Sequence, residues 1–270
     1  MGRLLLCGKE AENPYEVEEL DLRLYTIEEL CYYVFHNVPL LRDDFIDERL
    51  IGFIRRELQL PDIADKIARF YHSPSDADNT LYMLLSEVGY YSESELQEFQ
   101  ETLAKKRKKN GPERVKDRAD SLASQKRYQA AVRVYRTLSD EDRDARVTDE
   151  MKCEALEKMA DCYGRLCAYR EALSCLERAY NETGDERLLK KMYHVCMLSG
   201  LELDPFYFRD VPDAAVSRWQ QEYRSKEAAL KATIDRDPAM EMFFGDPATL
   251  KKELEEYADS RKEVCRRMLE

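Results

Sequence analysis

The residues best suited to chemistry in this sequence are cysteines and histidines, and most of them lie in its second half. Residues 160–180 read ADCYGRLCAYREALSCLERAY and contain Cys162, Cys167 and Cys175. Structural zinc sites use cysteine and histidine ligands, commonly in pairs two to four residues apart. None of the 8 cysteines forms a CxxC pair, and the chain has only 3 histidines. We therefore predict no metal and no cofactor, and expect these thiols to pack as small apolar side chains.

A catalytic pair is the other chemistry that cysteine and histidine could support. His194 and Cys196 stand two positions apart, and residues at that spacing on a helix do not face each other. The sequence shows no phosphate-binding glycine loop, metal-ligand helix, nucleophile elbow or kinase signature. We therefore predict that the protein is not an enzyme and assign no catalytic residues.

The composition favours a helical protein that binds neither nucleic acid nor membranes. The chain of 270 residues has 36% charged residues but only 9 glycines and 9 prolines, a composition rich in helix formers. Its net charge of -12 disfavours a long contact with nucleic acid or with an anionic membrane surface. No window approaches the roughly 20 apolar residues needed to span a bilayer. We expect an all-α protein in the cytoplasm, where its thiols would be reduced.

The first 110 residues are expected to form a mostly helical domain. Apolar runs at residues 4–7 and 22–25 predict a short N-terminal β-hairpin. Thr26 with Glu29 has the pattern of a capping box at a helix start, and Ser92 with Glu95 repeats it. The Asn-Gly-Pro sequence at residues 110–112 then predicts the end of this domain.

Two further helix starts are predicted between these capping boxes. Asp43 or Asp44 is expected to cap the second helix, and Pro61 suits the first turn of the third. Residues 105–109 read KKRKK, a run that could contact phosphates. In a chain this acidic, we expect instead that these cations complement the negative end of a helix dipole.

An internal repeat follows, with a shift of 41 positions. Six residues, Ala119, Leu122, Tyr128, Ala131, Tyr135 and Leu138, recur as Ala160, Tyr163, Tyr169, Ala172, Leu176 and Ala179. This pattern predicts two antiparallel helices in each repeat, with the alanines at close helix crossings and large side chains against the next repeat.

Residues 112–200 thereby resemble the tetratricopeptide repeat family, whose period is about 34 residues. The additional seven would fall in the polar connection SDEDRDARVTDE, as a longer loop or a helix extension. Residues 186–199 are expected to form the first helix of a third repeat. The opening LLLCGKEAENPY with YTIEELCYYVFHN also resembles uncharacterised bacterial repeat proteins. The resemblance implies a helical solenoid that binds other proteins.

Residues 201–270 are expected to form a C-terminal helical hairpin. They open with the aromatic turn Phe206, Tyr207 and Phe208, which we expect to tuck under neighbouring helices. A long helix from Pro212 and a last helix that ends near Met268 carry apolar residues at three- and four-residue spacing. The two helices should pair within the chain. A second copy is the alternative partner, which would give a homodimer through residues 212–268.

The family's pattern points to a concave surface lined by the first helix of each repeat. Seven residues would face it: Lys116, Asp117, Asp120, Glu157, Lys158, Asp161 and Arg165. Some relatives clamp a chaperone's C-terminal carboxylate with lysine, asparagine and arginine. Because Asp120 and Asp161 stand where that clamp needs a carboxylate binder, a basic or mixed-charge ligand fits better. We expect a scaffold that binds a peptide or helix of a partner protein.

The alternative function is a regulator that binds DNA through its N-terminal helices and senses a peptide through its repeats. Residues 44–71 could supply helices of suitable length, and Arg55 and Arg56 some positive charge. However, Asp62 and Asp65 open the third helix, where contacts to phosphates or bases would be needed.

Overall fold

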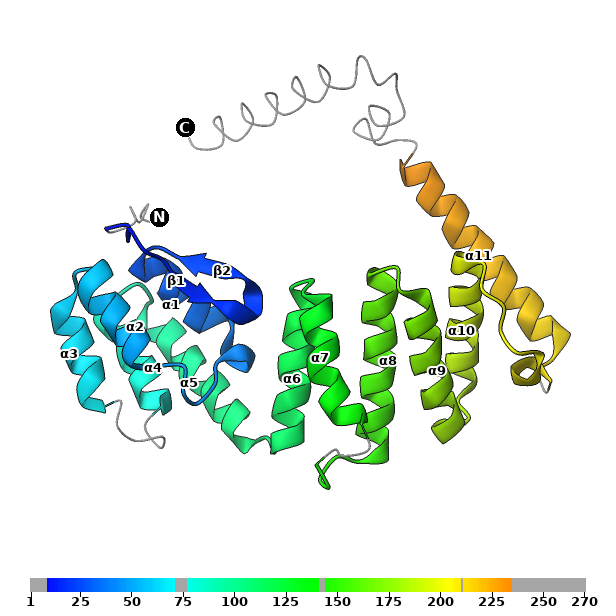
Figure 1. Cartoon of the computed structure of the whole chain (residues 1–270), viewed down its shortest axis with the longest axis horizontal. Helices are drawn as coiled ribbons and strands as arrows, with labels where there is room; N and C mark the ends of the chain where they lie inside the picture. The colour runs from blue at the N-terminus through cyan, green and yellow to red at the C-terminus, as the bar shows by residue number, and fades with distance from the viewer. Residues whose placement is uncertain (1–8, 71–76, 141–143, 210, 235–270) are drawn as a thin grey trace, which may run out of the picture. The chain divides into compact units, whose positions relative to one another are not determined.

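The computed structural model describes residues 9–70, 77–140, 144–209 and 211–234, and these are mostly helical (Figure 1). The contacts divide the chain into two compact units, Met1–Leu188 and Leu189–Glu270. The predicted all-α class with a short N-terminal hairpin is confirmed. Within the described ranges, no helix is long and apolar enough to cross a membrane. The α-helices of the N-terminal region are α1 Ile27–His36, α2 Glu48–Gly52, α3 Pro61–Phe70, α4 Ala77–Val88 and α5 Glu93–Lys108.

The N-terminal hairpin consists of β1 Tyr15–Val17 and β2 Leu22–Leu24, which are antiparallel. A 3₁₀ turn, η1 Glu18–Leu20, connects them, and Asp21 takes a left-handed conformation with φ 49°. The predicted second strand is therefore correct, but its partner is Tyr15–Val17. The run at residues 4–7, proposed as the first strand, lies outside the described residues.

The capping boxes begin their helices as predicted. The Thr26 hydroxyl accepts a hydrogen bond from the Glu29 amide at 3.2 Å, and the Glu29 carboxylate accepts one from the Thr26 amide. Ser92 and Glu95 form the same arrangement at the start of α5. A third capping box, between Asn110 and the residue three positions later, begins α6 Gly111–Ser124. The Asn-Gly-Pro stop is thus also a helix start.

The predicted cap of the second helix at Asp43 or Asp44 is wrong. The N-cap of α2 is Asp47, whose carboxylate accepts a hydrogen bond from the Leu50 amide at 2.8 Å. Asp47 has the extended backbone that an N-cap requires, whereas Asp44 pairs with Arg42 at 3.0 Å. After α2, the helix widens into a π-helical segment, η3 Phe53–Glu57, whereas the third helix begins at Pro61 as predicted.

The N-terminal helices enclose their own apolar core. Leu30, Ile54 and Leu84 come from three different helical segments and are fully buried. Aromatic rings extend this core, because Phe35 stacks on Tyr91 at a centroid distance of 4.1 Å. Burial of each such large apolar side chain contributes roughly 1.5–3 kcal/mol, which holds the short helices together.

Helices α6 and α7 Tyr128–Ser139 form one pair, and α8 Asp149–Arg165 and α9 Tyr169–Thr183 form the next (Figure 1). The shift of 41 holds at the helix ends: α6 and α8 end at Ser124 and Arg165, and α7 and α9 begin at Tyr128 and Tyr169. The helix starts differ, because α8 has 17 residues and α6 has 14. The additional residues of the repeat therefore lengthen both the first helix and the connection before it.

The turn between the two helices of a pair has the same backbone in both repeats. Lys126 and Cys167, which are 41 positions apart, take left-handed conformations with φ 62° and φ 58°. The next amide closes each turn: Arg127 donates to the Leu122 carbonyl, and Ala168 donates to the carbonyl of residue 163, both at 2.9 Å. The conserved shift is thus a property of the backbone as well as of the side chains.

Side chains at the helix crossings confirm the predicted packing. Ala119, Ala131 and Ala172 have exposed fractions of 0%, as expected where two helices approach closely. Tyr135 and Leu176 occupy equivalent positions on α7 and α9 and are also buried. A side chain larger than alanine at these crossings would force the helices apart.

The cysteines of residues 160–180 have two different environments. Cys162 and Cys175 are buried, as predicted, and burial raises the pKa of the Cys162 thiol to about 11. Cys167 is exposed, so the expectation that it packs in the interior is wrong. Its place in the left-handed turn directs the chain out of α8 and leaves its side chain at the surface.

The second unit contains most of α10 Glu186–Ser199, the 3₁₀ turn η5 Pro205–Phe208 and α11 Asp213–Ile234. The bounds of α10 match the predicted helix. Trp219 of α11 has an exposed fraction of only 2% and its ring lies 6.0 Å from that of Tyr193. Phe208 joins this aromatic cluster, but Phe206 is 69% exposed, so the aromatic turn is only partly tucked in. The last helix of the predicted hairpin lies outside the described residues.

Candidate partner-binding surface

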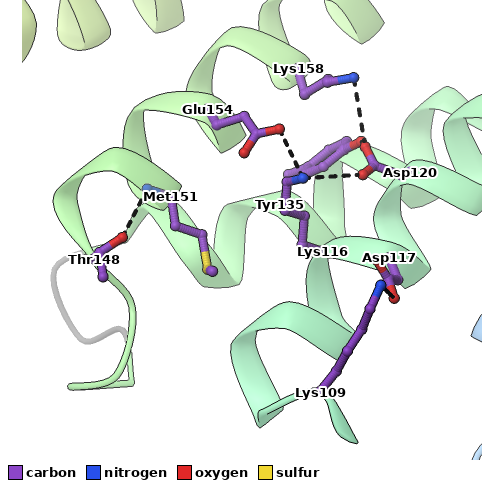
Figure 2. A network of polar contacts seen from close by, with 9 residues as sticks. All are labelled: Lys109, Lys116, Asp117, Asp120, Tyr135, Thr148, Met151, Glu154 and Lys158. Atoms are coloured by element: carbon purple, nitrogen blue, oxygen red, sulfur yellow. Dashed lines mark hydrogen bonds and ion pairs between the residues drawn. The ribbon is translucent and has the colours of Figure 1, made fainter. Parts of the chain in front are cut away.

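Helices α6 and α8, the first helices of the two repeats, bring charged side chains together. Lys116 and Asp120 are four residues apart on α6, and Glu154 and Lys158 are four apart on α8, so each pair shares one face of its helix. Figure 2 shows these four side chains pointing toward one another between the two helices. We refer to them as the charged cluster.

Lys116 is the centre of the charged cluster. Its ammonium lies 2.8 Å from a carboxylate oxygen of Glu154 and 3.7 Å from one of Asp120. Lys158 approaches Asp120 less closely, at 3.9 Å. The hydrogen bond with Glu154 is the main reason that the pKa of Lys116 is raised, although partial burial opposes this effect.

Tyr135 connects the charged cluster to the buried core of the repeats. Its ring is fully buried in α7, and its hydroxyl donates a hydrogen bond to Asp120 (Figure 2). Burial of the ring, followed by this hydrogen bond, raises the pKa of the Tyr135 hydroxyl well above its ordinary value. The side chain thus fills the space between the repeats and also fixes the carboxylate of Asp120.

The charged cluster is open to solvent to different degrees. The side chain of Lys116 is 26% exposed, and that of Lys158 is 47% exposed. Ion pairs at this exposure contribute little to stability, roughly 0–1 kcal/mol each, because water competes for both partners. A partner that displaces this water would strengthen the attraction between its own charges and the charged cluster, at the cost of desolvating both.

Three of the seven predicted surface residues, Lys116, Asp120 and Lys158, are thus brought together. Asp117 instead turns toward the end of α5 and pairs with Lys109 at 2.5 Å. Glu157 lies near Arg187, whose pKa is raised mainly by Asp185 and to a smaller extent by Glu157. The remaining two, Asp161 and Arg165, are exposed on the last turns of α8.

Sequence reasoning missed Glu154 and the polar role of Tyr135. Glu154 had a detectable signal, because it precedes Lys158 by four positions on the same helix. Tyr135 was identified only as a packing residue, and nothing in the sequence places its hydroxyl against Asp120. Among the residues that the structure describes, no three histidine, cysteine, aspartate or glutamate side chains gather in a way that could hold a metal ion.

Comparison with protein-family models, with curated proteins and with solved structures finds no match to this chain. The geometry of the repeats and of the charged cluster is therefore the available guide to function.

Proposed function

We propose that this protein is a non-catalytic scaffold that binds a peptide or helix of a partner protein on the surface formed by α6 and α8. The charged cluster is the observation that supports this proposal. It presents two ammonium and two carboxylate groups on helices whose positions are fixed by the packing of the repeats. Fixed charges of both signs provide specificity, because a partner must match their order as well as their sum.

The geometry favours a ligand with charges of both signs. Lys158 is the most exposed cation of the charged cluster and is held only weakly, so it is available to a carboxylate of the ligand. Asp120 is 35% exposed and can accept a ligand cation beside it. The N-terminal 110 residues contain more acidic than basic side chains, which supports a protein ligand over nucleic acid.

We further propose that the scaffold acts in the cytoplasm. All six cysteines in the described part of the chain are free thiols, which is the usual state in a reducing compartment.

Selection of peptides from a random displayed library against the wild-type protein tests the proposed surface. The selected peptides are then measured against Lys158→Glu and against Arg170→Glu, a charge reversal on the exposed side of α9. We expect Lys158→Glu to weaken binding by about threefold to tenfold, while Arg170→Glu changes it by less than twofold.

Equal affinities for all three proteins would refute the assignment of this surface. Equal losses in both variants would attribute binding to net charge alone and would refute it as well. Circular dichroism of each variant confirms that the helices are intact.

A further inference from the structure

A pocket of about 450 Å³ lies beside the N-terminal half of α6, on the face of that helix opposite Lys116 and Asp120 of the charged cluster. It forms where residues 39–44 meet the end of α5 and the start of α6. Four cations line it, Arg42, Lys106, Arg114 and Arg118, together with the carboxylates of Asp43 and Asp44. We refer to this site as the basic pocket.

Helix periodicity and one long-range hydrogen bond build the basic pocket. Gly111, Arg114 and Arg118 recur at three- and four-residue spacing, so they lie on one face of α6. Lys106, in the last turn of α5, donates a hydrogen bond from its ammonium to the Leu41 carbonyl. This bond holds the end of α5 against residues 39–44 and keeps the lysine at the wall of the pocket.

The positive charge of the basic pocket is only partly neutralised within the protein. Arg42 pairs with Asp44, and Arg118 pairs with Glu19. Lys106 bonds to an uncharged carbonyl, and Arg114 is exposed and pairs with no carboxylate of the described residues. The four cations face the carboxylates of Asp43, Asp44 and Glu19, which leaves a small local excess of positive charge in a chain whose net charge is -12.

The partly buried position of Lys106 disfavours its charged form. Burial is the main cause of its lowered pKa. The carboxylates of Asp43 and Asp78 oppose this shift, and the guanidinium groups of Arg114 and Arg118 add to it by a smaller amount. An anion in the basic pocket would interact favourably with all three cations. It would meet the least competition at Arg114, which pairs with no carboxylate in the described part of the chain.

We propose that the basic pocket binds an acidic segment of a protein partner, with two or more aspartate or glutamate side chains. Charge complementarity selects the acidic chemistry, and the apolar side chains of Leu40, Leu41 and Val115 can contact the aliphatic stems of such residues. A nucleic acid fits less well, because the four cations form a short patch that borders Asp43 and Asp44, whereas a polyanion needs an extended basic track. The inference extends the proposed function by adding a second surface with a different charge preference.

Fluorescence anisotropy with a labelled hexaglutamate peptide at low ionic strength tests this proposal. Most of the acidic chain repels this probe, so its binding reports a local site. The test variant is Arg114→Glu, which breaks no ion pair within the described residues, and its matched control is Arg133→Glu on the exposed side of α7. We expect Arg114→Glu to weaken binding by about fivefold or more, and Arg133→Glu by less than twofold.

Three results would overturn the proposal. The first is no binding of hexaglutamate to the wild-type protein, and the second is an equal loss in both variants. The third is tighter binding of a single-stranded oligonucleotide than of hexaglutamate, with the same loss in Arg114→Glu, which would assign the pocket to nucleic acid. Arg114→Gln, with an intermediate loss, confirms that charge rather than misfolding is responsible.

The same peptide distinguishes the two proposed surfaces. Lys158→Glu should leave hexaglutamate affinity within twofold of wild type, and Arg114→Glu should leave unchanged the affinity for library peptides selected on the surface of α6 and α8. Failure at one surface therefore does not imply failure at the other.

Discussion

Removal of the Tyr135 hydroxyl tests the link between the core of the repeats and the charged cluster. Tyr135→Phe preserves the buried ring but deletes the hydrogen bond to Asp120. Hydrogen bonds to charged groups contribute about 1.5–3 kcal/mol. Asp120 is 35% exposed and retains Lys116 at 3.7 Å and Lys158 at 3.9 Å, so water and ammonium groups replace part of the lost interaction. We therefore expect the free energy of unfolding to fall by about 1–2 kcal/mol.

The effect of Tyr135→Phe should also depend on pH. The pKa of Tyr135 is raised in the folded protein, so above the ordinary tyrosine value of about 10 the unfolded chain loses a proton that the folded chain keeps. The contribution of Tyr135 to stability is thus complete below pH 10 and is lost as the pH rises above it. One pH unit corresponds to about 1.4 kcal/mol, so the difference between wild type and Tyr135→Phe should nearly vanish at about pH 11.

Urea unfolding followed by circular dichroism at pH 7 and pH 11 measures both effects. Tyr128→Phe is the matched control, because Tyr128 begins the same helix and is partly exposed. A loss below about 0.5 kcal/mol at pH 7 would show that the hydroxyl is not held as described. A difference that persists unchanged to pH 11 would refute the assignment of the raised pKa to Tyr135.

Three further substitutions or reactions test the repeat structure. Ala172→Arg should unfold the second repeat, because Ala172 has an exposed fraction of 0% and the crossing has no room for a long charged side chain. The control variant Ser174→Arg, on the exposed side of α9, should have the melting temperature of wild type when unfolding is followed by circular dichroism. Lys126→Gly should raise the free energy of unfolding by roughly 0.5 kcal/mol, because the relief of left-handed strain at φ 62° exceeds the additional chain entropy that glycine loses on folding. A lower midpoint of urea unfolding would contradict this expectation. Iodoacetamide at pH 8 should modify the exposed Cys167 first and Cys31 at least about a thousandfold more slowly, because burial raises the pKa of Cys31 to about 12. Peptide mass mapping measures both rates, and modification of the two thiols at the same rate would disprove the burial pattern.

The repeats were predictable because side chains and backbone share one period. Buried alanines at Ala131 and Ala172 mark helix crossings, and crossings in equivalent places require equivalent turns. The sequence therefore predicted the two helix pairs and their shift of 41, and the period of apolar residues predicted the helix observed as α10 Glu186–Ser199.

Features that depend on a local backbone choice or on distant partners were not predictable. Asp43, Asp44 and Asp47 are chemically equivalent caps, and only the extended backbone at Asp47 decides among them. The exposure of Cys167 follows from a left-handed turn in which the sequence has no glycine. The ion pair between Lys116 and Glu154 joins two helices across the repeat and has no signature within either helix.

The matched turns make the chain divisible in whole modules. Deletion of residues 128–168, which is one period of 41, would join the turn after α6 directly to the start of α9. The fused pair would keep a left-handed residue at Lys126 and would place Ala119 opposite Ala172, two alanines that already occupy helix crossings. Such an excision removes α7 and α8 without changing the length of any helix–turn–helix unit that remains. The number of repeats can therefore change by gain or loss of one 41-residue segment, and each such change would add or remove one helix of the proposed binding surface.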